Sequence, residues 1–195
     1  KKIVSNQTEK TNYEIFIAAL NEYSKSKMDL DKEIETQISK ILTHDFPPLK
    51  VFFSPVAQAA EIVILARQLG YRLILATNPV FPLAAIKVRL QSAGFRVEDF
   101  EFITHAENMT RAKPRVAYYQ ELVNKLKLNP ECSLMIGNDP RKDLPAFDVG
   151  MKTFLVETDK NRHLIYKVKD ERITIRGNYK LLMELLKAKG PVCRS

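Results

Sequence analysis

Two aspartates, Asp139 and Asp143, lie four residues apart directly after a short apolar run, 133–136, that ends at Gly137. An apolar run of this length followed by glycine predicts a buried strand and then the start of a helix. At the carboxyl end of a parallel strand, where α/β proteins bind ligands, Asp139 would project into the crevice. A hard cation such as Mg²⁺ takes one or two protein carboxylates and completes its shell with water and phosphate oxygens. The spacing therefore indicates a candidate metal site.

The same residues also suit a plainer role. Asn138 or Asp139 could cap the helix, while Asp143 would lie on its solvated first turn. The motif alone leaves both interpretations open, so the rest of the chain has to be considered.

The composition is that of a globular protein: 195 residues, 45% of them hydrophobic. No apolar run is long enough to cross a bilayer and no signal peptide is recognised, so neither a membrane nor export is expected. Cys132 and Cys193 are far apart and form no Cys/His cluster, which predicts no disulfide framework or zinc site and a cytoplasmic location. The net charge of +8 is spread along the chain, so no specific nucleic-acid partner is expected.

The N-terminal part has a helical pattern. A capping box at 11–14 precedes an apolar stripe, and a second helix is expected over about 32–42. Between them, Asp29 and Asp31 have the spacing of a phosphoryl-transfer nucleophile loop. They follow a polar run instead of a hydrophobic strand, so helix capping is their expected role. The prolines at 47–48 mark a boundary.

Beyond this boundary helices and strands alternate, which is typical of a parallel sheet with covering helices. We therefore expect an α/β fold, a Rossmann-like parallel sheet with helices on both faces. Helices are expected over 54–69, 82–92, 114–126 and 179–186, with a further one ending at Gly150, and strands over 71–76, 100–104, 133–136, 152–156 and 173–175.

Three loops at the ends of these strands carry groups that could handle a phosphate: the hydroxyl of Thr77, the ammonium of Lys113 and the acid pair. Lys113 lies just before a helix, where a cation is electrostatically unfavourable. It could be an exposed lysine of a basic protein, or it could serve a site. A hydroxyl, an ammonium and two carboxylates at one sheet edge would make a phosphate site with a metal.

In the order and spacing of these loops, the chain resembles the haloacid dehalogenase superfamily, in its phosphatase branch with a helical cap. The resemblance is strongest over 51–156. It implies a partial helical cap at 1–48 and an α/β core at 49–195.

The resemblance also implies roles for individual residues. Thr77 would hydrogen-bond the transferring phosphoryl oxygen, with Asn78 beside it. Lys113 would offset the negative charge of the nucleophile and the phosphoryl group, so that its removal should reduce kcat while leaving folding nearly unchanged. Asp139 would bind Mg²⁺, and Asp143 would orient the lysine or a metal-bound water.

One family motif is absent. The hydrophobic strand that runs into Asp-x-Asp-Gly-Thr, which supplies the nucleophile, is not found, and we expect it upstream of Lys1. The implied function is a Mg²⁺-dependent phosphatase that acts on a small phosphorylated metabolite through a phospho-aspartate. The alternatives are a non-catalytic binding module of the same fold or a 2-haloacid dehalogenase, which needs no Mg²⁺.

Overall fold

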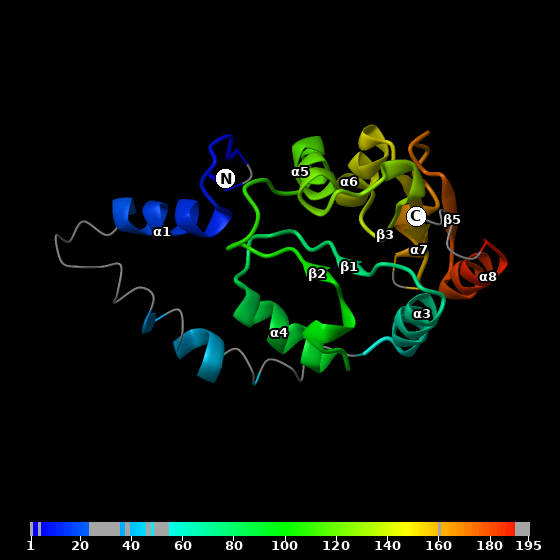
Figure 1. Ribbon diagram of the computed structural model, residues 1–195, viewed down its shortest axis with the longest axis horizontal. Coiled ribbons are helices and arrows are strands. Elements are labelled where there is room, and N and C mark those ends of the chain that lie inside the picture. The colour runs from blue at the N-terminus through cyan, green and yellow to red at the C-terminus, as the bar shows by residue number, and fades with distance from the viewer. Residues whose placement is uncertain are drawn as a thin grey trace. The chain divides into compact units, whose positions relative to one another are not determined.

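The computed structural model describes residues 2–3, 5–23, 36–37, 40–45, 48, 55–159 and 161–189 (Figure 1). The chain divides into two compact units, each built from two stretches of sequence. Unit 1 comprises Lys1–Val56 and Ile74–Ala112, and unit 2 comprises Ala57–Leu73 and Lys113–Ser195. Every strand pair among these residues is parallel, so the fold class is α/β with a Rossmann-like core, as predicted. The expected boundary between residues 48 and 49 stays a prediction.

Unit 1 contains a two-stranded sheet of β1 (Ile74–Leu75) and β2 (Phe102–Ile103), both shorter than predicted. The chain passes between them through α4 (Leu83–Ser92). Ile86 and Leu90 of α4 pack against β2, and partly buried apolar side chains surround this small core. The alternation of helix and strand read from the sequence is therefore confirmed in this unit.

The N-terminal helix α1 (Asn12–Tyr23) also belongs to unit 1, together with the π-helical turn η1 (Ile41–Asp45) and the 3-10 turn η3 (Val97–Asp99). The predicted capping box is confirmed, because the Thr11 N–H and hydroxyl both donate to the Glu14 carboxylate, at 2.7 and 2.8 Å. Asp29 and Asp31 lie outside the described residues, as does most of the helix predicted over 32–42.

Unit 2 is built on a three-stranded sheet with the order β3 (Leu134–Gly137), β4 (Lys152–Val156), β5 (Ile175–Gly177). Two long helices, α3 (Ala57–Gln68) and α8 (Tyr179–Lys189), contact one another beside it. Their apolar side chains share a single buried cluster with residues of β4. This cluster is the main core of the unit.

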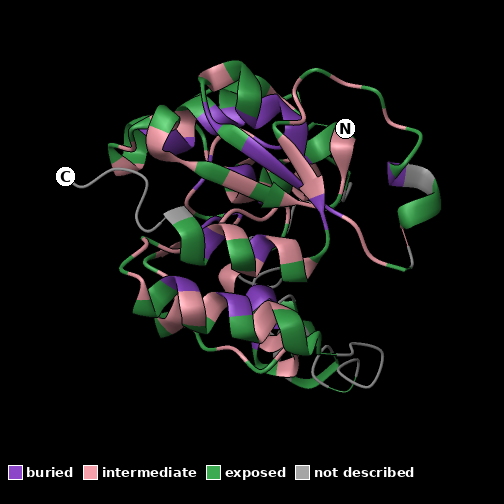
Figure 2. Ribbon diagram, turned by 90° about the vertical axis from the view of Figure 1, so that its right-hand side faces the viewer, coloured by how far each residue is buried: buried purple, intermediate pink, exposed green. Residues whose placement is uncertain are grey.

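The central strand β4 is buried on both faces (Figure 2). Phe154 and Val156 belong to the cluster that α3 and α8 cover. Because side chains alternate along a strand, Leu155, which is 1% exposed, faces the opposite side. There the 3-10 helix η5 (Leu144–Val149) contacts β4 and packs against α5 (Val116–Leu126).

Strand β3 lies at the edge of this sheet, because within the described residues it pairs with β4 alone. Its apolar residues Leu134 and Ile136 are 36% and 39% exposed. An exposed apolar edge of this kind can accept a further strand.

Strand β5 begins two residues later than the stretch predicted at 173–175. The cause is a side-chain interaction, since the backbone N–H groups of Thr153 and Thr174 each donate to the other residue's hydroxyl, at 3.0 and 3.1 Å. These bonds take the place of a backbone pair, so the ladder starts at Ile175.

The helix predicted to end at Gly150 is divided in two. A single α-turn, α6 (Pro140–Asp143), leads directly into η5, which has Pro145 in its first turn. Proline lacks the N–H that would continue the α-helical ladder. Gly150 ends η5 in the left-handed region, φ 91°, which matches its predicted role as a stop. A short helix that the sequence did not indicate, α7 (Arg162–Ile165), follows β4.

Two observations concern the environment of the chain. Cys132 lies at the end of the 3-10 turn η4 (Pro130–Cys132), and the expectations of no disulfide framework and of a cytoplasmic location stay predictions. Cys193 lies outside the described residues. Among the helices in the described part of the chain, none has the length and apolar character that a bilayer span requires.

Candidate active site

Asp143 is the most firmly held carboxylate near the end of β3. The residue is 8% exposed, and its Oδ1 lies 2.8 Å from the Nζ atom of Lys113. Its Oδ2 accepts hydrogen bonds from the backbone N–H groups of Asn138 at 3.1 Å and Asp139 at 3.0 Å. One cation and two amides therefore compensate the buried charge. The interpretation that placed Asp143 on a solvated turn is wrong.

Gly137 makes this approach possible. A Cβ atom at this position would lie 2.2 Å from Oδ2 of Asp143 and 2.3 Å from its Cγ. Any side chain here would collide with the carboxylate that the next two amides hold. The glycine that the sequence indicated as a strand end thus also makes room for the acid.

Lys113 is buried, with 5% of its surface exposed, so the interpretation of a surface lysine is wrong. Besides the Asp143 carboxylate, its Nζ atom faces the rings of Tyr118 and Tyr119, 5.6 Å from each centroid. Burial lowers the pKa of Lys113, and the charge of Asp143 offsets part of that shift. The Lys113–Pro114 peptide bond is cis.

The tyrosine pair was not among the predicted site residues. Tyr118 and Tyr119 are fully buried and pack edge to face, with ring centroids 4.9 Å apart. Burial raises the pKa of Tyr119, so its hydroxyl stays protonated and donates to the Lys142 carbonyl at 2.6 Å. This bond ties α5 to α6. The only signal in the sequence was the apolar face of the helix that follows Lys113, which predicted packing and not a lysine environment.

Asp139 has a more exposed setting, with 38% of its side chain accessible. It caps α6, because Oδ1 accepts the backbone N–H groups of Arg141 at 3.1 Å and Lys142 at 3.3 Å. Its Oδ2 lies 2.8 Å from the Lys142 ammonium. Burial acts to raise the pKa of Asp139, but the hydrogen bond and charge of Lys142 prevail and lower it. The capping role that the sequence allowed is thus present.

The donor set for a cation is incomplete in the part of the chain that the structure describes, where no three His, Cys, Asp or Glu side chains cluster. Asp139 offers one carboxylate, and Mg²⁺ can bind through one or two carboxylates with water and phosphate oxygens completing the octahedron. The ammonium of Lys142, 48% exposed on a flexible stem, holds that carboxylate and could move away. Within the described residues, Asp139 is therefore the one carboxylate at this end of β3 that could serve one side of a Mg²⁺ site, and its binding of a metal stays a prediction.

Thr77 and Asn78 lie in unit 1, in the loop after β1. The Thr77 hydroxyl donates to the Thr104 carbonyl at 2.6 Å, and the Thr104 hydroxyl donates to the Thr77 carbonyl at 3.1 Å. Thr104 is fully buried at the end of the second strand, and no pattern in the sequence marked it as a site residue. For Thr77 to donate to a phosphate, its hydroxyl must exchange this bond. The structure thus brings Lys113, Asp139 and Asp143 together in unit 2. Thr77 and Asn78 belong to unit 1.

Comparison with protein families gives a consistent result. The family model described as haloacid dehalogenase-like hydrolase matches residues 8–148, the span that holds all five predicted site residues. The chain belongs to the haloacid dehalogenase-like hydrolases. A search of curated proteins found no match.

Solved structures share the fold at low identity. A HAD phosphatase from Thermococcus onnurineus is 18% identical with a TM-score of 0.51, over 67% of this chain and 56% of that one. A dehalogenase is 17% identical with a TM-score of 0.57, over 89% of this chain and 70% of that one. A dehalogenase with an intermediate complex is 16% identical with a TM-score of 0.56, over 88% of this chain and 69% of that one. The chain thus spans little more than half the length of the phosphatase that it resembles.

Proposed function

We propose that this chain is part of a Mg²⁺-dependent phosphatase that hydrolyses a small phosphorylated metabolite. The observation that carries the proposal is the buried ion pair of Lys113 and Asp143 beside Asp139, at the carboxyl end of β3. Phosphoryl transfer depends mainly on positioning and on charge stabilisation. A fixed ammonium next to a carboxylate that a cation can reach suits that chemistry.

Each residue has a role in this proposal. Asp143 holds the Lys113 ammonium, which would offset the negative charge of the phosphoryl group and of the carboxylate nucleophile. Asp139 binds Mg²⁺, which when present neutralises phosphate charge. Thr77 and Asn78 hydrogen-bond the phosphoryl oxygens.

The nucleophile completes the reaction and is proposed to be an aspartate on a strand upstream of Lys1. Its carboxylate attacks phosphorus, the ester P–O bond breaks, and the alcohol leaves after its oxygen takes a proton from solvent. Water then hydrolyses the phospho-aspartate to inorganic phosphate and the free carboxylate. The exposed edge of β3 supports such a strand, since Leu134 and Ile136 could pack against it. A cytoplasmic location and the lack of a specific nucleic-acid partner are parts of the same proposal.

A dehalogenase is the second candidate, because two of the similar structures are dehalogenases and they match more of this chain than the phosphatase does. The acid pair Asp139 and Asp143 favours the phosphatase, since dehalogenation needs no cation. A non-catalytic binding module of the same fold is the third candidate.

The experiment is to express the intact protein with its upstream segment and to assay two reactions. Release of phosphate from p-nitrophenyl phosphate with Mg²⁺, abolished by EDTA, is expected. Halide release from 2-haloacids without metal, in the absence of phosphatase activity, would replace the proposal by the dehalogenase. Inactivity in both assays would favour the binding module. Residues 1–195 alone should be inactive, because they lack the nucleophile.

A further inference from the structure

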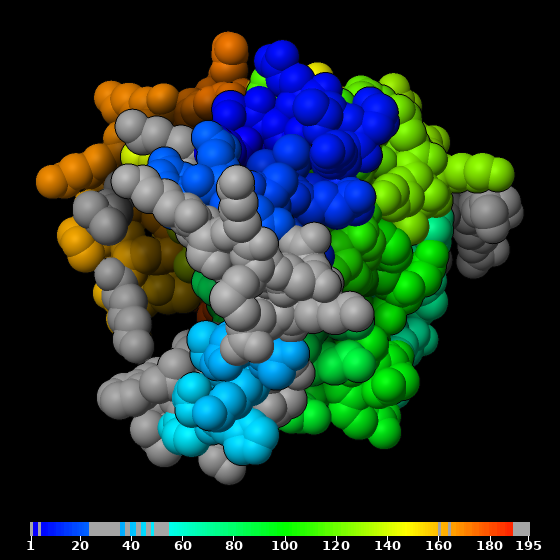
Figure 3. Space-filling view, turned by 90° about the vertical axis from the view of Figure 1, so that its left-hand side faces the viewer, coloured from blue at the N-terminus to red at the C-terminus, as the bar shows by residue number. Residues whose placement is uncertain are grey.

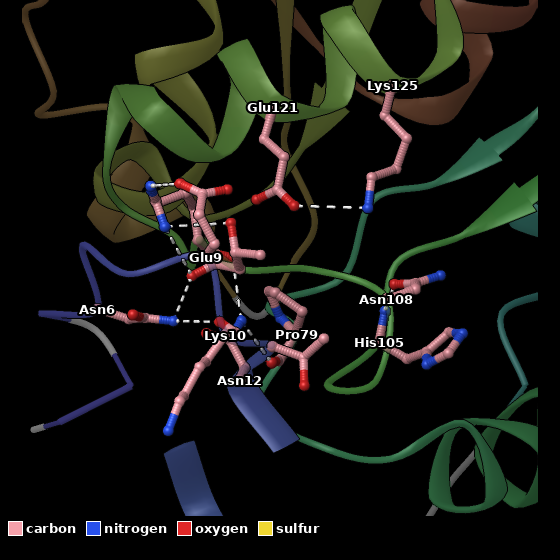
Figure 4. Close-up of polar contacts among 12 residues, drawn as sticks. Asn6, Glu9, Lys10, Asn12, Pro79, His105, Asn108, Glu121 and Lys125 are labelled. Atoms are coloured by element: carbon pink, nitrogen blue, oxygen red, sulfur yellow. Dashed lines mark hydrogen bonds and ion pairs between the residues drawn. The ribbon is translucent and has the colours of Figure 1, made fainter. Parts of the chain in front are cut away.

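Asn12, in the first turn of α1, is fully buried and connects two loops of unit 1 (Figure 4). Its Nδ2 atom donates to the Pro79 carbonyl at 3.2 Å and to the Arg111 carbonyl at 3.1 Å. These carbonyls are far from Asn12 in the sequence and belong to two separate loops. A single amide group thus fixes the distance between them.

The orientation of the amide follows from its partners. Both are carbonyl oxygens, which can only accept, so the nitrogen of the Asn12 amide has to face them. The Oδ1 atom therefore points the other way, and it is one of the few buried side-chain polar atoms without a hydrogen-bond partner among the described residues.

The backbone of α1 makes contact with the same loop. The N–H groups of Asn12 and Tyr13 donate to the carbonyls of Met109 and Ala106, both at 2.9 Å. Two of the first helical N–H groups are thus satisfied by the loop at 106–111. Figure 3 shows the N-terminal segment, in blue, beside the green residues of the same unit.

The loops joined by Asn12 adjoin the residues assigned to the phosphate. Pro79 directly follows Asn78, and Arg111 precedes Lys113 by two residues along the chain. We infer that Asn12 is a positioning residue, whose amide holds in place the Thr77–Pro79 loop, which carries the two residues assigned to the phosphoryl group, Thr77 and Asn78. This inference rests on the proposed function.

The amide is the part of Asn12 that joins the two loops. An apolar side chain of similar size could fill the same space, but it would leave the Pro79 and Arg111 carbonyls without this shared donor.

The test uses the intact protein and the variant Asn12→Ala. Within the loop, the Val80 N–H donates to the Asn78 carbonyl at 2.8 Å and serves as a reporter. We expect faster hydrogen exchange at Val80, measured by NMR, and a fall in kcat/KM of roughly ten- to hundred-fold, because small misplacements of contact groups slow catalysis strongly. Asn12→Ser, which is too short to reach both carbonyls but leaves a smaller void, should show the same changes in milder form.

Asn6→Ala is the matched control. Asn6 is also buried on the N-terminal segment, and its Nδ2 donates to two carbonyls, those of Lys10 and Thr110, both at 2.8 Å. It does not bond the Thr77–Pro79 loop. This variant should lower the melting temperature at least as much as Asn12→Ala while leaving kcat/KM and Val80 exchange close to wild type.

The outcomes separate the two claims. Equal Val80 exchange and equal kcat/KM in the Asn12→Ala and Asn6→Ala variants would overturn the inference, as would faster exchange with unchanged kcat/KM. If the wild-type protein has no phosphatase activity, the proposed function fails by itself. Exchange at Val80 then still decides whether Asn12 holds the loop.

Discussion

Two ion pairs on either side of the short helix α6 have the same length and very different surroundings. Lys113 with Asp143, and Lys142 with Asp139, are both 2.8 Å apart. In the first pair the side chains are 5% and 11% exposed, and in the second they are 48% and 38% exposed. The N···O distance alone therefore does not show which ion pair contributes more to stability.

Burial decides what each pair can do. Removing one partner of a buried pair leaves a charge without compensation, whereas an exposed pair exchanges its partner for water or another ion at little expense. The buried pair can keep an ammonium in one place during catalysis. The exposed pair can open, and Asp139 is then free to take a cation.

The largest effect is expected from breaking the buried pair. Lys113→Met should destabilise the intact protein by about 3–5 kcal/mol, because the buried Asp143 carboxylate loses the ammonium that compensates its charge. This differs from the sequence-based expectation that folding would be nearly unchanged. Urea unfolding gives the value. The loss of kcat should be roughly 10²-fold or more.

A second substitution and a matched pair sharpen this prediction. Lys113→Met combined with Asp143→Asn should recover part of the stability, since the amide oxygen can still accept the two backbone N–H groups. Lys142→Met, at the exposed pair, should change stability by less than about 1 kcal/mol. Equal losses of stability in Lys113→Met and Lys142→Met would show that burial does not distinguish the two ion pairs.

Metal binding tests the other side of the comparison. Mg²⁺ should stabilise the intact protein by about 2.7 kcal/mol at a concentration 100-fold above its Kd, and Asp139→Asn should abolish most of this gain. Thermal unfolding over a Mg²⁺ titration measures it. Lys142→Met should keep the protection. A melting temperature that does not respond to Mg²⁺ in any variant would contradict the assignment of Asp139.

Gly137→Ala should disturb the buried pair without touching either charge. The added Cβ would lie 2.2 Å from Oδ2 of Asp143, so the carboxylate has to move, at an expected loss of about 1–3 kcal/mol. Gly177→Ala is the control, because its nearest neighbour is the end of a flexible side chain, Leu181 Cδ2 at 2.4 Å. The denaturant concentration at the unfolding midpoint should therefore be lower for Gly137→Ala than for Gly177→Ala. A smaller loss in Gly137→Ala than in Gly177→Ala would argue against a rigid Asp143.

The smallest expected effect is the loss of the Asp139 contribution to stability at acidic pH. The pKa of Asp139 in the folded protein is lowered from 3.8, so its contribution to stability is present above 3.8 and is lost as pH falls through the folded value. Because the group is exposed by more than a third, the contribution is small. The difference in urea midpoint between wild type and Asp139→Asn should therefore narrow as pH falls from 6 toward 3. A difference that grows in acid would reverse the assigned sign.

Much of the fold was determined by local sequence. The capping box at Thr11, the stops at Gly70, Gly94 and Gly150 and the alternation of helix with strand are all seen in the structure. These features depend on neighbours within a few residues, which is why a sequence reveals them. Of the exceptions, the late start of β5 arises from a side-chain partner that local pattern does not specify. The division at Pro145 does have a local cause, because proline lacks the N–H of the helical ladder, but the helix predicted from the sequence ran past it.

The site shows where local information ends. The sequence by itself determined which residue types stand after which strands, including Lys113, Asp139 and Asp143, because motif order is a property of the chain. Only the tertiary structure decided that Lys113 and Asp143 are buried together while Asp139 stays accessible. The physical reason is that the ion pair joins two residues that are 30 positions apart in the chain, which no local pattern specifies. The rings of Tyr118 and Tyr119 then face the Lys113 ammonium, and two consecutive amides bind Asp143.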